Sequence, residues 1–95
     1  MTVTFAGHAH VALVVDDLDA ARRFYIDGLG LTELPRPDFG IPGMWLRAGA
    51  AQVHFIEHET LPVNGPGFPH FALAIPADEW DATIEALRSR GVEFM

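Results

Sequence analysis

Residues 10–31, HVALVVDDLDAARRFYIDGLGL, decide the fold of this chain because two hydrophobic periods follow one another in them. Over residues 10–15 every second residue is bulky and apolar, which is the period of a β-strand with one buried face. From Leu18 onward the apolar residues recur every three or four positions, which is the period of an amphipathic helix. The stretch therefore predicts a strand and then a helix, with Asp17 as the helix N-cap and a glycine at its end.

Three further strands are expected after this helix. Leu31–Leu34 is a short expected strand ended by prolines, which cannot donate to a strand ladder. Residues 43–48 and 51–57 lie on either side of Gly49-Ala50 and predict a β-hairpin. Together with the first strand and the helix, these segments make one βαβββ module over about residues 8–58.

The opening strand has a second copy later in the chain. HVALVV at residues 10–15 and HFALAI at residues 70–75 share the pattern His-x-Ala-Leu-x-(Val/Ile), and acids and an amphipathic stretch follow each copy. A connecting loop, residues 59–69, separates the modules, and the second module covers residues 70–95. Its expected elements are a strand, a helix and the start of another strand, at residues 71–75, about 78–90 and 92–95.

The second module is shorter than the first. The strand that would correspond to residues 51–57 falls beyond residue 95. A sheet without that strand has an unpaired edge, which is a liability for solubility. We therefore expect a single domain over residues 1–95 whose second module is incomplete, either by truncation or disorder or because another chain supplies the missing strands.

The amino-acid composition excludes some classes of binding partner. The 95 residues are 49% hydrophobic, carry a formal net charge of −7 and include no cysteine. Nucleic acids and anionic membranes require a basic face, so neither is the expected partner. The missing cysteines exclude disulfides and thiolate metal sites. No apolar run is long enough for a membrane span, and the N-terminus lacks the basic start of a signal peptide, which indicates a soluble cytoplasmic protein.

Histidines gather on one face of the expected sheet. In the first, fourth and fifth strands the bulky apolar residues face the helices, which leaves the opposite, small-residue face open. His10, His54 and His70 fall on this open face, whereas His8 and His58 lie near strand ends and are expected to face solvent. Three neutral imidazoles from different strands suit a divalent metal such as Zn, Ni, Co, Mn or Fe(II), with positions left for substrate.

Two further side chains are candidates for substrate binding. Trp45 and Arg47 share a face of the third strand, beside the strand that carries His54. On the open face they would supply an aromatic wall and an anion anchor; on the other face they would be a packing tryptophan and a surface arginine. Glu57 is out of phase with His54, and Glu59 lies in the loop, so neither is expected as a carboxylate ligand.

The same residues resemble a known family. The runs DLDAARRFYIDGLGL at residues 17–31, QVHF at 52–55 and HFAL at 70–73 are similar to motifs of the vicinal oxygen chelate superfamily. That superfamily includes glyoxalase I, bleomycin resistance proteins, fosfomycin resistance enzymes and extradiol dioxygenases, and the resemblance covers essentially the whole chain. It implies an α+β fold of paired βαβββ modules, forming a cupped mixed sheet with helices on the outer face, commonly in a homodimer around a divalent metal.

The resemblance also implies a ligand set. Members of the superfamily take their metal ligands from the first, fourth, fifth and eighth strands, which by position gives His10, His54 and His70 as the first three. The fourth, usually a glutamate, has no counterpart in this sequence. Histidine at position 54, where glyoxalase I usually has a carboxylate, departs from that subfamily.

The residues and the resemblance lead to two hypotheses of different functional classes and to a third, less favoured one. The leading hypothesis is a metal-dependent enzyme acting on a small substrate that chelates through adjacent oxygens, as a lyase or isomerase, a ring-cleaving dioxygenase or a resistance enzyme. The alternative is a metal-free drug-binding protein of the bleomycin resistance type, which the acidic charge favours. The third is a scaffold or one half of a dimer without activity of its own.

Overall fold

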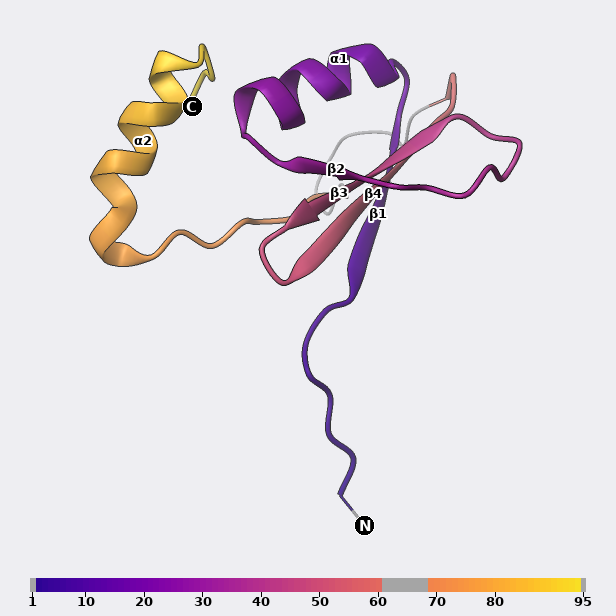
Figure 1. Cartoon of the computed structure of the whole chain (residues 1–95), viewed down its shortest axis with the longest axis horizontal. Coiled ribbons are helices and arrows are strands. Elements are labelled where there is room, and N and C mark those ends of the chain that lie inside the picture. Colours follow the sequence, from indigo (N-terminus) through magenta and orange to yellow (C-terminus); the bar gives the residue numbers. More distant parts are fainter. Residues whose placement is uncertain (1, 61–68, 95) are drawn as a thin grey trace.

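The computed structural model describes residues 2–60 and 69–94 and shows a four-stranded mixed sheet (Figure 1). Its strands, in chain order, are β1 (His10–Val15), β2 (Thr32–Leu34), β3 (Gly43–Ala48) and β4 (Ala51–Glu57). In the sheet they are ordered β1-β4-β3-β2, with β1 parallel to β4 and the other neighbours antiparallel. The α+β class and the βαβββ order predicted for the first module are confirmed.

The two faces of the sheet differ in burial because successive side chains point to opposite sides of a strand. The buried core consists mainly of apolar side chains from the two central strands: Met44, Leu46, Val53 and Phe55, with Ala21 from the first helix. The apolar residues of β1 on this face are only partly buried. The core therefore lies between the first helix and the central strands, and the opposite face, which carries the histidines, stays open.

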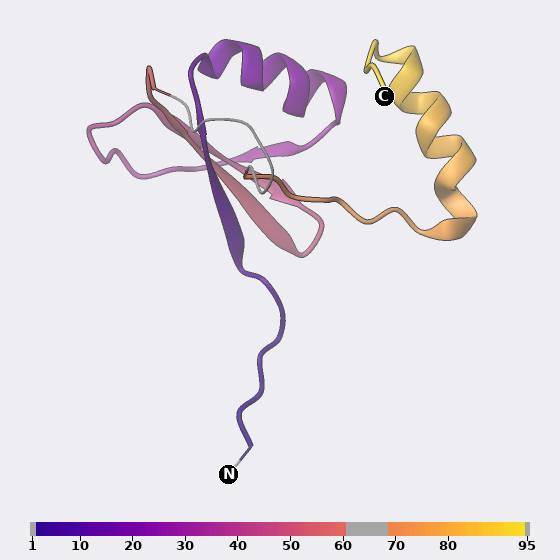
Figure 2. The same cartoon turned by 180° about the vertical axis from the view of Figure 1, so that it is seen from behind.

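The first helix covers the apolar face and changes its winding partway along. Regular α-helix, α1 (Leu18–Arg22), continues as a π-helical segment, η1 (Arg23–Gly28), and the two form one coiled ribbon over the sheet (Figures 1 and 2). Ala21 is buried in the core, and the ring of Tyr25 lies 4.6 Å from that of Phe55. The periodicity thus predicts the helix and its buried side, while the wider π turn carries no signal in the hydrophobic pattern.

Two carboxylates fix the start of α1. Asp17 Oδ1 accepts a hydrogen bond from the Ala20 N–H at 3.0 Å, which confirms the predicted N-cap. Glu57 Oε2, at the end of β4, accepts from the Leu18 N–H at 2.8 Å. Both pair backbone donors that a helix start leaves unsatisfied and place negative charge at the positive end of the helix. Glu57 therefore works on the helix side of the sheet, away from the histidines.

The second module differs from the prediction in its strands. Its helix is confirmed as a short η2 (Ala77–Glu79) followed by α2 (Trp80–Ser89). The strand predicted at 71–75 is wrong, and residues 92–94 form no strand either. A strand needs a neighbour for its N–H and C=O groups, and the described chain pairs no strand with these segments. Much of the predicted connecting loop, and Met95, lie outside the described residues.

Helix α2 stands beside the end of η1 rather than on the sheet (Figures 1 and 2). The predicted apolar side of α2 is only partly covered by other residues: no residue of the helix is buried, and Trp80 is 54% exposed. Phe71, earlier in the second module, does reach the core and lies 6.3 Å from the ring of Tyr25. In the part of the chain that the structure describes, no helix is long and apolar enough to cross a membrane.

Candidate functional site

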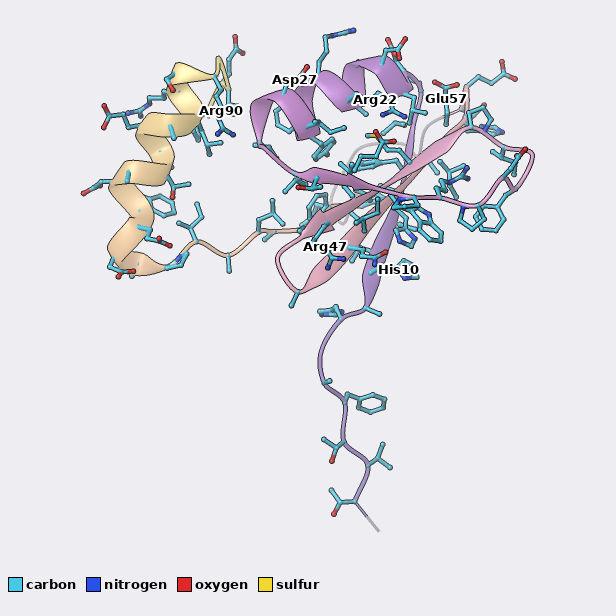
Figure 3. The ribbon with its side chains drawn as sticks, in the orientation of Figure 1. His10, Arg22, Asp27, Arg47, Glu57 and Arg90 are labelled. Atoms are coloured by element: carbon cyan, nitrogen blue, oxygen red, sulfur yellow. The ribbon has the colours of Figure 1, made fainter. Side chains whose placement is uncertain are left out.

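The open face of the sheet carries two rows of paired side chains. β3 and β4 pair Trp45 with His54 and Arg47 with Gln52, and β1 pairs His10 with Gln52. Trp45 and Arg47 therefore lie on the same face as His10 and His54. Figure 3 shows His10 and Arg47 at the same end of the sheet. The sequence pattern placed His10, Gln52 and His54 on one face, and the pairing of β3 with β4 adds Trp45 and Arg47 to it.

Three rings of this face form a continuous stack. The His10 and His54 ring centroids are 4.1 Å apart with planes 14° from parallel, and Trp45 stacks on the other side of His54 at 4.2 Å and 7°. Ala12, the β1 partner of His54, has no side chain beyond its Cβ and so leaves room for the His10 ring. The stack holds both imidazoles in fixed planes on an otherwise accessible surface.

Gln52 fixes the tautomer of the central imidazole. Its Oε1 lies 2.8 Å from His54 Nε2. An amide oxygen accepts only, so Nε2 carries the proton and donates, which leaves Nδ1 with its lone pair. In this arrangement His54 offers Nδ1 as a base or metal ligand, and ligation through Nε2 would require Gln52 to turn away.

The pKa of His54 lies below its ordinary value of 6.5. Partial burial against the flanking rings is the largest cause, and the nearby charges of His10 and Arg36 add to it. Neutral imidazole is the form that binds metals and accepts protons. The environment of this face therefore favours the reactive form of His54.

We expect this pKa to be measurable in metal-free protein. Protonation of His54 is less favourable in the folded than in the unfolded chain, so its contribution to stability is present above pH 6.5 and is lost as pH falls through the folded-state pKa. An NMR titration of the ring nitrogens should find that His10→Ala and Arg36→Gln both raise the pKa of His54. Arg88→Gln, on α2, should leave it unchanged; a similar rise in that variant would mean that overall charge, not this neighbourhood, sets the value.

His70 does not join the other two histidines. Among residues 2–60 and 69–94, no group of three or more His, Cys, Asp and Glu lies close enough to hold a metal ion. Residues 71–74 nevertheless border His10, since together with His8 and Gln52 they line a cavity of about 190 Å³ beside β1. The structure thus places His10 beside His54, and the described residues form no group of three that includes His70. Metal ligation by these histidines stays a prediction.

A cation that the sequence pattern did not single out lies beside this face. Arg36, in the loop between β2 and β3, places its guanidinium 5.0 Å from the centre of the Phe39 ring, and Phe39 in turn lies 6.1 Å from Trp45. A Cβ at Gly43 would first meet the Phe55 carbonyl oxygen of the paired strand and would also come within 2.8 Å of Arg36 Nη2. The glycine thus allows the close approach of β4 and leaves room for the guanidinium. Only the flanking prolines marked this loop in the sequence, and they predict a turn rather than a site.

The remaining candidates take local roles. His8 is exposed, and Nδ1 of His58, also exposed, accepts a hydrogen bond from the Thr60 N–H at 3.1 Å. Glu57 is bound to the start of α1, as described above, and so is not available to the open face.

Comparison with family models gives one match over nearly the whole chain. The model of the Glyoxalase/Bleomycin resistance protein/Dioxygenase superfamily matches residues 7–95. Comparison with curated proteins gave no significant match.

Solved structures share the fold at low sequence identity. A protein from Bacillus anthracis assigned to the glyoxalase family superposes with a TM-score of 0.73 at 23% identity, over 98% of this chain and 76% of that one. A glyoxalase/bleomycin resistance protein/dioxygenase from Nocardioides gives 0.67 at 23% identity, over 98% and 67%. A mutant of the fosfomycin resistance protein FosX from Listeria monocytogenes, complexed with Mn(II) and 1S,2S-dihydroxypropylphosphonic acid, gives 0.68 at 21% identity, over 95% and 73%.

Proposed function

Because the chain belongs to the glyoxalase/bleomycin resistance protein/dioxygenase superfamily, we propose that it is a metal-dependent enzyme whose substrate chelates a divalent metal through adjacent oxygens. The metal would lie on the open face of the sheet, held by His10 and His54. His70, which the family resemblance assigns as a further ligand, would join them from the second module. Trp45 and Arg47 would hold the substrate beside the metal.

The meeting of His10 and His54 on one face carries this proposal. The two imidazoles come from β1 and β4, which are far apart in sequence and adjacent in the sheet, with ring centroids 4.1 Å apart. His54 is kept neutral by its surroundings and keeps a free lone pair at Nδ1. Two neutral imidazoles with open space around them are donors that suit Zn, Ni, Co, Mn and Fe(II).

A bound divalent ion would supply Lewis acidity to the paired oxygens of the substrate. The chain's own residues supply the rest: Trp45 offers a flat apolar wall, Arg47 a cation for an anionic group, and Gln52 holds the His54 ring in one orientation. The structural neighbour FosX, complexed with Mn(II) and a small diol phosphonic acid, supports a substrate of this general kind. Lyase, isomerase, dioxygenase and resistance chemistry all fit these residues equally.

The alternative is a metal-free binding protein of the bleomycin resistance type. The stacked rings favour this alternative. His10, His54 and Trp45 pack on one another as a flat aromatic surface, and the parallel ring planes do not direct the two imidazoles toward a common ion. The net charge of −7 would attract a cationic drug. In this case the three rings would be a stacking platform for a flat ligand.

Metal titration separates the two functions. Metal-free protein is titrated with Mn(II), Zn(II), Ni(II), Co(II) and Fe(II) under anaerobic conditions, and binding is followed by calorimetry. The enzyme proposal expects one ion per chain and, on binding, a shift of the His10 and His54 ring resonances. Binding of no ion, together with binding of bleomycin by the metal-free protein, would establish the alternative instead. The homodimer and the cytoplasmic location belong to the same proposal; light scattering and cell fractionation test them.

A further inference from the structure

Arg36 lies outside the group of residues assigned above, and neighbouring residues hold its side chain in place. Its guanidinium lies against the face of Phe39 and over Gly43, and it is close enough to His54 for its charge to act on that imidazole. The side chain is partly buried although it belongs to an irregular loop. The ring of Phe39 supports the guanidinium in this position.

Within residues 2–60 and 69–94, the Nε of this arginine is buried without a hydrogen-bond partner, and no carboxylate forms an ion pair with the guanidinium. Glu33 instead pairs with Arg22, and Asp38 accepts from the Gly40 N–H at 2.8 Å. Because a buried N–H is normally paired, the guanidinium offers a donor that the described chain does not itself use.

On one side of Arg36, the rings of Phe39 and Trp45 lead along the open face to His54 and His10. Arg36 also borders a separate open hollow of about 850 Å³, which is lined by Glu33 and Asp38 and by neither Phe39 nor Trp45. Its two carboxylates make this hollow the less suitable side for an anion.

We propose that Arg36 binds the anionic end of the ligand, a carboxylate or phosphonate carried on a small flat apolar body, while that body lies against Phe39 and Trp45. The proposal rests on the proposed function for the placement of the ligand's other end at His10 and His54. Guanidinium forks match the planar geometry of carboxylates and the spacing of phosphonate oxygens. The proposal also assigns the binding of the anionic group to Arg36 rather than to Arg47. Arg47 is exposed, and no aromatic ring is found stacked on it among the described residues.

Benzoate and benzamide form a matched pair of probes, because they share a ring and differ in charge. Binding is measured on protein stripped of metal and then freed of chelator, by the NMR shifts of the Arg36 Nε–H and the Trp45 indole N–H, in the wild type and in Arg36→Gln, Arg36→Lys, Arg47→Gln and Arg88→Gln. Arg88 is the control because its guanidinium also lies over a phenylalanine ring, at 5.6 Å from Phe94. Without metal in the sample, failure of the metal proposal leaves this measurement unaffected.

Arg36→Gln is expected to weaken benzoate binding at least about tenfold, which corresponds to about 1.4 kcal/mol, and to leave benzamide binding unchanged. Arg36→Lys, which keeps the charge but loses the fork, should retain part of the affinity, and Arg88→Gln should behave as wild type. Thermal unfolding of each variant confirms that it is folded. The proposal is overturned if wild type does not prefer benzoate over benzamide, or if folded Arg36→Gln keeps that preference; loss of the preference in Arg47→Gln alone would assign the anchor to Arg47 instead.

Discussion

Phe55→Ala is expected to cost about 3–5 kcal/mol of the free energy of unfolding, because it leaves a large cavity at the centre of the core. Phe55 is completely buried, its ring lies 4.6 Å from that of Tyr25, and its neighbours in the sheet are Met44 and Leu13. Domains of this size are stable by only about 5–15 kcal/mol, so the variant loses a large share of its total stability. Each kcal/mol lowers the melting temperature of a domain this small by about 4–8 °C. Urea denaturation followed by circular dichroism measures the loss.

Ile56→Ala is the matched control for this prediction. Ile56 is the next residue of β4, has its side chain on the open face and is 38% exposed. Removing a partly exposed side chain leaves no closed cavity, so the expected loss is below about 1.5 kcal/mol. Equal losses in the two variants would contradict the assignment of the covered and open faces, on which the location of the site depends.

The same alternation explains why the first module is predictable from sequence. A half-buried strand must show its apolar residues at every second position, so β1, β3 and β4 are visible in the sequence before any pairing is known. The alternation did not decide on which side Trp45 and Arg47 lie; their pairing with His54 and Gln52 does. The parallel pairing of β1 with β4 cannot be read from periodicity either, and it is what brings His10 beside His54.

The second module shows the limit of this reasoning. HFALAI at residues 70–75 has the strand pattern of residues 10–15, but the described chain offers it no partner strand, and it stays without regular structure. The pattern reports which side chains suit a buried face, whereas a strand also requires a neighbour for its backbone groups. His70 therefore lies in the repeat without the strand that the repeat predicts, and its role as a ligand stays a prediction.

Arg36 escaped prediction for a different reason. It stands between two prolines in an irregular loop, where no period relates one residue to the next. Its position depends on the space over Gly43 and on the ring of Phe39, which are three-dimensional contacts. Ring stacking of His10 on His54 is likewise a matter of rotamers and pairing register, and the sequence shows only that both residues share a face.

Replacing His10 or His54 by alanine is expected to weaken metal binding by more than about a hundredfold. Loss of residues that merely orient a ligand already costs about ten- to a hundredfold, and loss of a donor atom costs more. Both histidines are at least partly exposed, so their removal should not unfold the protein, and urea denaturation checks this. Calorimetric titration with the tightest-binding ion measures the affinity of each variant, with His58→Ala as the control because His58 is an exposed histidine at the end of β4.

His70→Ala decides the third ligand in the same titration. In the structure, His70 does not belong to a metal-sized group, but the chain that follows it borders the cavity beside His10. A loss comparable to that in His10→Ala would mean that metal binding draws the start of the second module onto the open face. Wild-type affinity in His70→Ala, with strong losses in His10→Ala and His54→Ala, would restrict the ligands of this chain to the stacked pair. Wild-type affinity in all three variants would contradict a metal centre on this face, because any ion bound would then lie elsewhere.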